Sequence, residues 1–217
     1  MERQETMSSE FEKVEIDGKK YVVAPPNASR MVRAMGRLSY DFEQAIADLI
    51  DNSIAAHATV VEIVVDQRIG GRIYVHVADN GQGITEENLP AAIQYGAADR
   101  EDDSSLGVYG FGLKTACQSF TSNFSVISKT VGDDSVNMIT FDEAIIDQHN
   151  KFLFATESAP KKYVSELAGL INGVSGTLIV TENADKVITS ENAKDDNKTK
   201  SFCSHQIRAK SPSSSGT

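Results

Sequence analysis

The chain has 217 residues, of which 40% are hydrophobic and 24% charged, so it can build the core of one domain, with or without an appendage. Its formal net charge of −10 and its pI of about 4.9 argue against a chain-wide attraction to nucleic acid or to an anionic membrane, although not against a local basic patch. No apolar run approaches the ~18–20 residues of a membrane span, and the N-terminus lacks the apolar core of a signal peptide. Two distant cysteines, Cys117 and Cys203, form no metal or redox motif, so we expect a cytoplasmic protein with reduced thiols and no membrane contact.

The N-terminal part predicts a small hairpin followed by two helices. The runs "KVEI" and "KKYVV" alternate around Asp17-Gly18, which is a typical hairpin turn. After two prolines, a helix is predicted over about 28–38. A second helix begins near Asp41, which can cap it together with Gln44 three residues later. The apolar stripe of this second helix consists of Phe42, Ile46, Leu49, Ile50 and Ser53.

Strands and short helices are predicted to mix from residue 59 to residue 182. Two β-branched runs around Gly70-Gly71 predict a second hairpin, and a short helix is predicted over about 86–95. The run "LKTACQSF" predicts a further helix. Further strands are predicted in "FSVISKTV", "VNMITFD", "KFLFATES" and "GTLIVTE". This pattern favours an α+β fold with a largely antiparallel sheet.

Residues 183–217 differ from the rest of the chain because they carry few large apolar side chains and end in "SPSSSGT". Such a segment cannot bury enough apolar surface to order itself. We therefore expect a polar, disordered tail. It resembles either a point of truncation or a sequence that has left its original reading frame.

Asp48 and Asn52 lie four residues apart on the second predicted helix, so they share one face at the rim of the apolar stripe. They can face a cleft together, although an ordinary solvated pair would show the same spacing. The stretch "DNGQGIT" follows a predicted strand, which places Asp79 at the strand end, and its glycines allow close backbone approach. A simple turn would also fit, whereas the alternating acidic ligands of a calcium loop are absent.

The stretch "GVYGFGLKT" places three glycines before a predicted helix, whose N-terminus can bind an anion. It is not a P-loop, because Leu113 separates Gly112 from Lys114, and it reverses the order of a dinucleotide-binding fingerprint. On its own it could be a flexible loop that caps a helix. A fourth short motif, Gly176-Thr177, opens a late strand.

These four motifs, in this order, resemble those of the GHKL ATPase superfamily, which includes gyrase B-type topoisomerase subunits, the ninety-kilodalton heat-shock chaperone, histidine kinases and MutL-type ATPases. "DLIDNSIAAHA", "DNGQGI", "GVYGFGLK" and "SGTLIV" correspond to the four boxes of the family, and "YGFGLKTA" is most similar to the microrchidia branch. The resemblance implies a Bergerat two-layer sandwich, in which helices cover one face of a mixed, mostly antiparallel sheet. The resemblance runs from about residue 38 to residue 182. Together with the hairpin signal and the composition, it divides the chain into an N-terminal extension with the hairpin (1–27), an ATP-binding domain (28–182) and the tail (183–217).

The resemblance also implies roles for individual residues. Asp48 matches the carboxylate that activates the attacking water, and Asn52 matches the asparagine that holds Mg²⁺ on the phosphates of ATP. Asp79 matches the aspartate that reads the adenine amine, Thr177 supports it, and Lys114 matches a phosphate-side lysine. The remaining matching residues are expected to line the adenine pocket or to anchor a lid and the phosphates, and they are Gly81, Gly83, Gly107, Tyr109, Gly110, Phe111 and Gly112.

One departure from the family pattern affects the expected activity. Hydrolysing branches usually carry glutamate where this chain has Asp48, whose side chain is one methylene shorter, and geometry decides whether a base works. The leading hypothesis is an ATPase domain that closes its lid over Mg-ATP and dimerises, with slow or absent turnover because no transducer domain follows. The alternatives are a non-hydrolysing nucleotide-binding module or truncated remnant, and a histidine-kinase domain, which would need a phosphoacceptor helix pair upstream. The sequence identifies no client or nucleic-acid partner.

Overall fold

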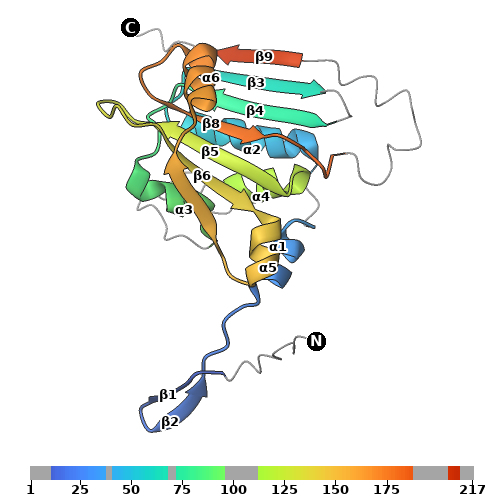
Figure 1. The fold of residues 1–217 in the computed structure, drawn as a ribbon, viewed down its shortest axis with the longest axis vertical. Helices are drawn as coiled ribbons and strands as arrows, with labels where there is room; N and C mark the ends of the chain where they lie inside the picture. The colour runs from blue at the N-terminus through green and yellow to red at the C-terminus, as the bar shows by residue number, and fades with distance from the viewer. Residues whose placement is uncertain (1–10, 38–40, 68–71, 96–111, 188–204, 211–217) are drawn as a thin grey trace, which may run out of the picture.

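The computed structural model describes residues 11–37, 41–67, 72–95, 112–187 and 205–210. Its main body is a seven-stranded sheet in the order β7-β6-β5-β8-β4-β3-β9, and every neighbouring pair in it is antiparallel (Figure 1). The strands of this sheet are β3 (Val60–Gln67), β4 (Ile73–Asp79), β5 (Asn123–Lys129), β6 (Asn137–Asp142), β7 (Phe154–Ser158), β8 (Gly176–Thr181) and β9 (His205–Lys210).

Helices lie on both faces of this sheet. One face carries α1 (Ala28–Met35), α2 (Phe42–Ala55), α3 (Leu89–Ile93), α4 (Gly112–Phe120) and α5 (Glu143–His149), and a 3₁₀ turn, η1 (Glu86–Asn88), leads into α3. The other face carries α6 (Lys161–Ile171), which lies in front of the sheet in Figure 1, with α2 behind it. Within the described ranges, no helix combines the length and the apolar character needed to cross a bilayer.

The two faces of the sheet follow from the two-residue period of its strands. Val77 and Ile179 point into the larger core beneath the helical layer, whereas their neighbours Ala78 and Leu178 contact the smaller core under α6. The strands are therefore apolar on both faces, and this explains why β4 is buried along its whole length.

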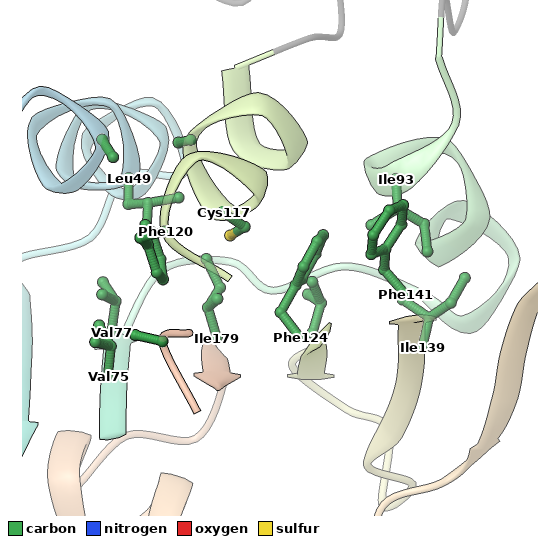
Figure 2. Close-up of a cluster of buried hydrophobic side chains, with 14 of the residues drawn as sticks. Leu49, Val75, Val77, Ile93, Cys117, Phe120, Phe124, Ile139, Phe141 and Ile179 are labelled. Atoms are coloured by element: carbon green, nitrogen blue, oxygen red, sulfur yellow. The ribbon is translucent and has the colours of Figure 1, made fainter. Parts of the chain in front are cut away.

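The larger core joins α2 and α4 to the middle of the sheet. Leu49 of α2 and Cys117 and Phe120 of α4 lie above the strand side chains, among them Phe124 and Phe141 (Figure 2). The rings of Phe124 and Phe141 stack with centroids 5.1 Å apart. This packing holds α2 and α4, which carry two of the four sequence motifs, side by side on the sheet.

The N-terminal hairpin is confirmed and forms a sheet of its own. Strands β1 (Lys13–Ile16) and β2 (Lys19–Val22) pair antiparallel around Asp17 and Gly18, whose φ angles are 51° and 73°. Positive φ at both central residues is what a type I′ hairpin turn requires. The hairpin projects from the main body in Figure 1, and its residues are largely exposed.

The predicted α+β fold is confirmed, with differences in detail. The sheet contains no parallel pair among the described strands, and α6 covers part of the second face, because Leu167 and Ile171 supply an apolar stripe for it. The boundary after residue 182 is wrong, because Ala184 is buried in the larger core and its N–H donates to Ile73 O over 2.8 Å.

The expectation of a disordered tail is also wrong for residues 205–210, which form β9 at the edge of the sheet beside β3. This strand joins the sheet through its backbone pairing with β3, so the polar composition of the segment did not exclude it. The rest of the tail, 188–204 and 211–217, lies outside the described residues.

Phe141 tests this account of the core. Its side chain is 0% exposed and packs between the rings of Phe124 and Phe154, so Phe141→Ala should lower the free energy of unfolding by about 3–5 kcal/mol. Urea denaturation followed by circular dichroism measures this loss. Val131→Ala is the control, because Val131 is 69% exposed and its truncation should stay within about 0.5 kcal/mol. Similar losses in the two variants would contradict the assignment of the core.

Candidate functional site

A row of buried polar residues crosses the sheet at the ends of four strands. Asp79 of β4 is the register partner of Thr177 of β8, which pairs in turn with Ser128 of β5, and Ser128 pairs with Asn137 of β6. All four residues are buried. They lie two positions from side chains of the larger core, so the row faces the helical layer.

Asp79 is the charged residue of this row. One carboxylate oxygen accepts from Gly81 N–H over 2.8 Å, and the other accepts from the Ser53 hydroxyl over 3.2 Å. Thr177 N–H also stabilises the carboxylate. Burial raises the pKa of Asp79 above its ordinary value, and the three hydrogen bonds oppose the rise because they favour the charged form. Two of the residues predicted to bind the base, Asp79 and Gly81, are thus in direct contact.

The loop after β4 makes a close approach to the end of β5. Gly83 has a φ of +73°, and a Cβ atom there would lie 2.0 Å from Lys129 O. A side chain at this position is therefore excluded by both conformation and space. The structure thus gives Gly83 a structural reason to be glycine, at the edge of the polar row.

Three residues that the sequence analysis did not single out hold this loop in place. The Asn80 carboxamide oxygen accepts from the N–H groups of Thr59 and Val60, each over 2.8 Å. On the opposite side, the Ser175 hydroxyl donates to Gly81 O over 2.8 Å. The third is Ser128, whose hydroxyl accepts from Ile84 N–H over 2.8 Å. Asn80 lies within the motif "DNGQGIT", where its role is to hold the loop.

Helix α2 carries Asp48 and Asn52, and it packs beside α4. Both side chains are half-buried, and neither makes a hydrogen bond to any residue of the described ranges. The amide nitrogen of Asn52 lies 3.9 Å from the point where a Cβ atom on Gly112 would stand. Since Gly112 begins α4, Asn52 sits beside a helix N-terminus that can bind an anion.

Lys114, the predicted phosphate-side lysine, lies in a buried environment. Its side chain is buried, its ammonium donates to Gln94 O, and it lies 5.4 Å from the centroid of the Tyr95 ring. Burial lowers the pKa of Lys114 to about 8. The phosphate contact of Lys114 stays a prediction.

Four predicted site residues, Gly107, Tyr109, Gly110 and Phe111, lie outside the described residues. Within the described ranges, no group of three or more His, Cys, Asp or Glu side chains could hold a metal ion. Mg²⁺ at nucleotide sites commonly takes one or two protein oxygens, with phosphates and waters as the other ligands. The Asn52 carboxamide therefore fits a metal that is carried by a nucleotide.

A cleft of about 420 Å³ opens on the second face of the sheet, away from the polar row. Its lining residues are Ser122, Asn123, Ser125, Met138, Tyr163, Val180, Glu182 and Asn183. None of them is a predicted site residue. The candidate site is therefore defined by the buried polar row and α2, and not by this cleft.

The comparisons with known proteins match the part of the chain that contains these site residues. A family model described as "Histidine kinase-, DNA gyrase B-, and HSP90-like ATPase" matches residues 40–177. A crystal structure of the "N terminal domain of a DNA repair protein" is similar with a TM-score of 0.47 and 19% identity, over 81% of this chain and 45% of that one.

Several curated proteins are similar over part of the chain. "DNA mismatch repair protein PMS1" of Arabidopsis thaliana is 31% identical over 116 residues, which are 50% of this chain and 12% of that protein. "ATPase MORC2B" of Mus musculus is 28% identical over 172 residues, which are 64% and 17%. "DNA mismatch repair protein MutL" of Leptospira biflexa is 30% identical over 126 residues, which are 56% and 20%. The chain thus spans only 12 to 20% of the length of these relatives.

The buried ammonium of Lys114 predicts a pH dependence of stability. Its pKa is about 8 in the folded chain and 10.5 ordinarily, so between these values the unfolded chain binds the extra proton. The contribution of Lys114 to the free energy of unfolding therefore rises with pH across this window. Lys114→Met keeps a long side chain without the amine, so the stability of the natural chain relative to this variant should increase from about pH 8 to about pH 10.5.

Urea denaturation at several pH values measures this relative stability. Comparing the two chains cancels the titration of Cys117 and Tyr95, whose pKa values burial raises. A stability difference that stays constant, or that falls as the pH rises from about 8 to 10.5, would contradict the burial of the Lys114 ammonium.

Proposed function

The chain belongs to the family of histidine kinase-, DNA gyrase B- and HSP90-like ATPases, and from this premise we propose that it binds ATP with Mg²⁺ and hydrolyses it. The base would lie against the polar row, and the phosphates would lie at the start of α4. The proposal assigns each end of the nucleotide to residues whose places are set by the contacts described above.

The observation that carries the proposal is the buried, hydrogen-bonded carboxylate of Asp79. An ionised carboxylate offers about four acceptor positions, and three donors reach it from Gly81, Ser53 and Thr177. The remaining capacity suits the exocyclic amine of adenine. Because the site is poorly solvated, a base that lacks this donor would leave a charged acceptor unpaired, which is costly.

Helix α2 connects the two ends of the proposed site. Ser53 contacts Asp79 at the base end, and Asn52 lies beside Gly112 at the phosphate end. Asp48 precedes Asn52 by one helical turn, about 6 Å along the helix axis. A single rigid element can thus position a base contact, a metal ligand and a carboxylate for the attacking water.

The proposed chemistry is an attack of water on the γ-phosphorus of ATP. The bond to the oxygen that bridges the β- and γ-phosphorus breaks, ADP leaves with that oxygen, and Asp48 accepts the proton of the water. Mg²⁺, when bound, would neutralise charge on the phosphates. The N–H groups at the start of α4 and the Asn52 carboxamide would orient that end of the nucleotide.

We extend the proposal, on the family resemblance, to lid closure and to an ATP-dependent homodimer. The lid is the stretch "YGAADREDDSSLGVYGFG", which lies largely outside the described residues. A non-hydrolysing nucleotide-binding module is the second candidate. It is favoured by the short side chain of Asp48, which no hydrogen bond within the described ranges orients towards a water.

The choice of nucleotide tests the base contact. The chain should bind ATP and ADP at least about tenfold more tightly than GTP, and Asp79→Asn should weaken ATP binding by about 10- to 100-fold. The amide would direct an N–H group at donors that now face a carboxylate. Isothermal titration calorimetry measures these affinities, with Asp134→Asn on an exposed loop as the matched control. Equal affinities of the natural chain for ATP and GTP would refute the assignment.

The roles of Asp48 and Asn52 can be separated because they act on different groups. Asn52→Ala removes an oxygen ligand and should weaken both Mg-ATP binding and hydrolysis. Asp48→Asn keeps the shape but removes the base, so it should leave ATP binding nearly unchanged and lower turnover by about 10²–10⁴-fold. Phosphate release and calorimetry provide the two measurements.

Asp51→Asn is the control for this comparison, because Asp51 is exposed on the same helix. If the natural chain turns over too slowly to measure, Asp48→Glu, which restores the longer carboxylate of the hydrolysing branches, should raise the rate. If Asp48→Asn keeps its turnover, Asp48 is not the base and another group must act as the base. ATP binding without turnover in both the natural chain and Asp48→Glu would favour the non-hydrolysing module.

A further inference from the structure

Ser128 lies at the centre of the polar row and belongs to none of the four sequence motifs. It is 1% exposed on β5, and its hydroxyl oxygen makes three contacts. The oxygen lies 2.8 Å from the N–H nitrogen of Ile84, 3.0 Å from the carbonyl oxygen of Gly176 and 3.0 Å from the hydroxyl oxygen of Thr177. Ser128 therefore joins the loop after β4 to the start of β8.

The proton positions of these three contacts follow from the chemistry of the groups. A hydroxyl has one proton to donate and two lone pairs that accept, whereas the Ile84 N–H only donates and the Gly176 carbonyl only accepts. The Ser128 proton must therefore go to Gly176, and the contact with Thr177 must use the Thr177 proton. This is the single arrangement in which all three contacts are hydrogen bonds, and it fills the capacity of Ser128.

The consequence falls on Thr177, the neighbour of Asp79 in the register. Because its proton points at Ser128, the Thr177 hydroxyl offers only lone pairs in other directions. The Asp79 carboxylate is also an acceptor. Two adjacent acceptors favour a ligand edge that carries donors, either directly or through an ordered water, and they disfavour a carbonyl oxygen.

We propose that Ser128 is a positioning residue that locks the Thr177 hydroxyl as an acceptor, and that it thereby sharpens selection for a purine with an exocyclic amine over one with a carbonyl. The inference rests on the proposed ATP-binding function and adds a specificity determinant to it. Without the Ser128 hydroxyl, the Thr177 proton is free to rotate and can donate to a carbonyl oxygen of the wrong base.

The test compares ATP with inosine triphosphate, in which a carbonyl replaces the exocyclic amine of adenine and the neighbouring ring nitrogen N1 carries a proton. Isothermal titration calorimetry on the full chain gives the ratio of the two affinities. Ser128→Ala should lower this preference for ATP by about tenfold, the effect of one hydrogen bond, chiefly through tighter binding of the inosine nucleotide. Ser128→Thr keeps the hydroxyl and should retain the preference.

Three further variants separate this role from a structural one. Thr177→Val removes the locked acceptor and should lower the preference by itself, and adding Ser128→Ala should then have no further effect. Ser125→Ala is the matched control, because Ser125 lies on the same strand with its side chain on the opposite face, and its hydroxyl makes a similar 2.8 Å contact with that of Thr140. It should leave the preference unchanged.

The outcomes distinguish this inference from the function on which it rests. If the natural chain prefers ATP but Ser128→Ala weakens both nucleotides equally, Ser128 has only a structural role and the inference is wrong. If the natural chain binds no ATP, the proposed function fails and the inference fails with it. If Ser128→Ala does not fold, Ser128→Thr and Thr177→Val decide. A preference for ATP that is kept in Ser128→Thr but lost in Thr177→Val supports the inference. A preference that is kept in both variants overturns it.

Discussion

The burial of the Asp79 carboxylate is the constraint that the rest of the candidate site must satisfy. A carboxylate with 7% exposure loses most of its hydration, so it must be hydrogen-bonded or neutralised. Its donors come from three separate places, namely the loop at Gly81, helix α2 at Ser53 and strand β8 at Thr177. Hydrogen-bonding this one charge therefore requires the loop, the helical layer and the sheet to be correctly placed relative to one another.

The fold meets this requirement through rigid elements and close backbone contacts. The apolar core fixes α2 against α4 and the sheet (Figure 2). Ser53 of α2 thereby contacts Asp79, and Asn52 lies beside Gly112 at the start of α4. On the other face, α6 leads through Ser175 to Gly176, where a Cβ atom would stand 2.0 Å from Asp79 O. A side-chain contact between the buried His76 and Glu166 also ties α6 to β4. Both faces of the sheet thus support the same strand end.

Local patterns predicted much of this arrangement from the sequence. Helix α2, with Gln44 accepting from Asp41 N–H at its start, and the hairpin β3–β4 carry clear periods and end signals. Strand β9 and the role of Ser128 could not be predicted, because they depend on pairing between segments that are distant in sequence. The motif predicts a phosphate contact for Lys114, but it cannot predict the burial of its ammonium against Gln94, which depends on tertiary packing. Helix α6 had a readable apolar period, from Tyr163 to Leu167 and Ile171, which the sequence analysis missed.

The central claim is that the buried carboxylate at the end of β4 reads the base of a nucleotide. A crystal structure of the chain with Mg²⁺ and a non-hydrolysable ATP analogue tests it most directly. We predict that the exocyclic amine of adenine lies within about 3.2 Å of an Asp79 carboxylate oxygen, with the phosphates at the start of α4. A base found elsewhere, for example in the cleft beside Tyr163 on the second face of the sheet, would contradict the account.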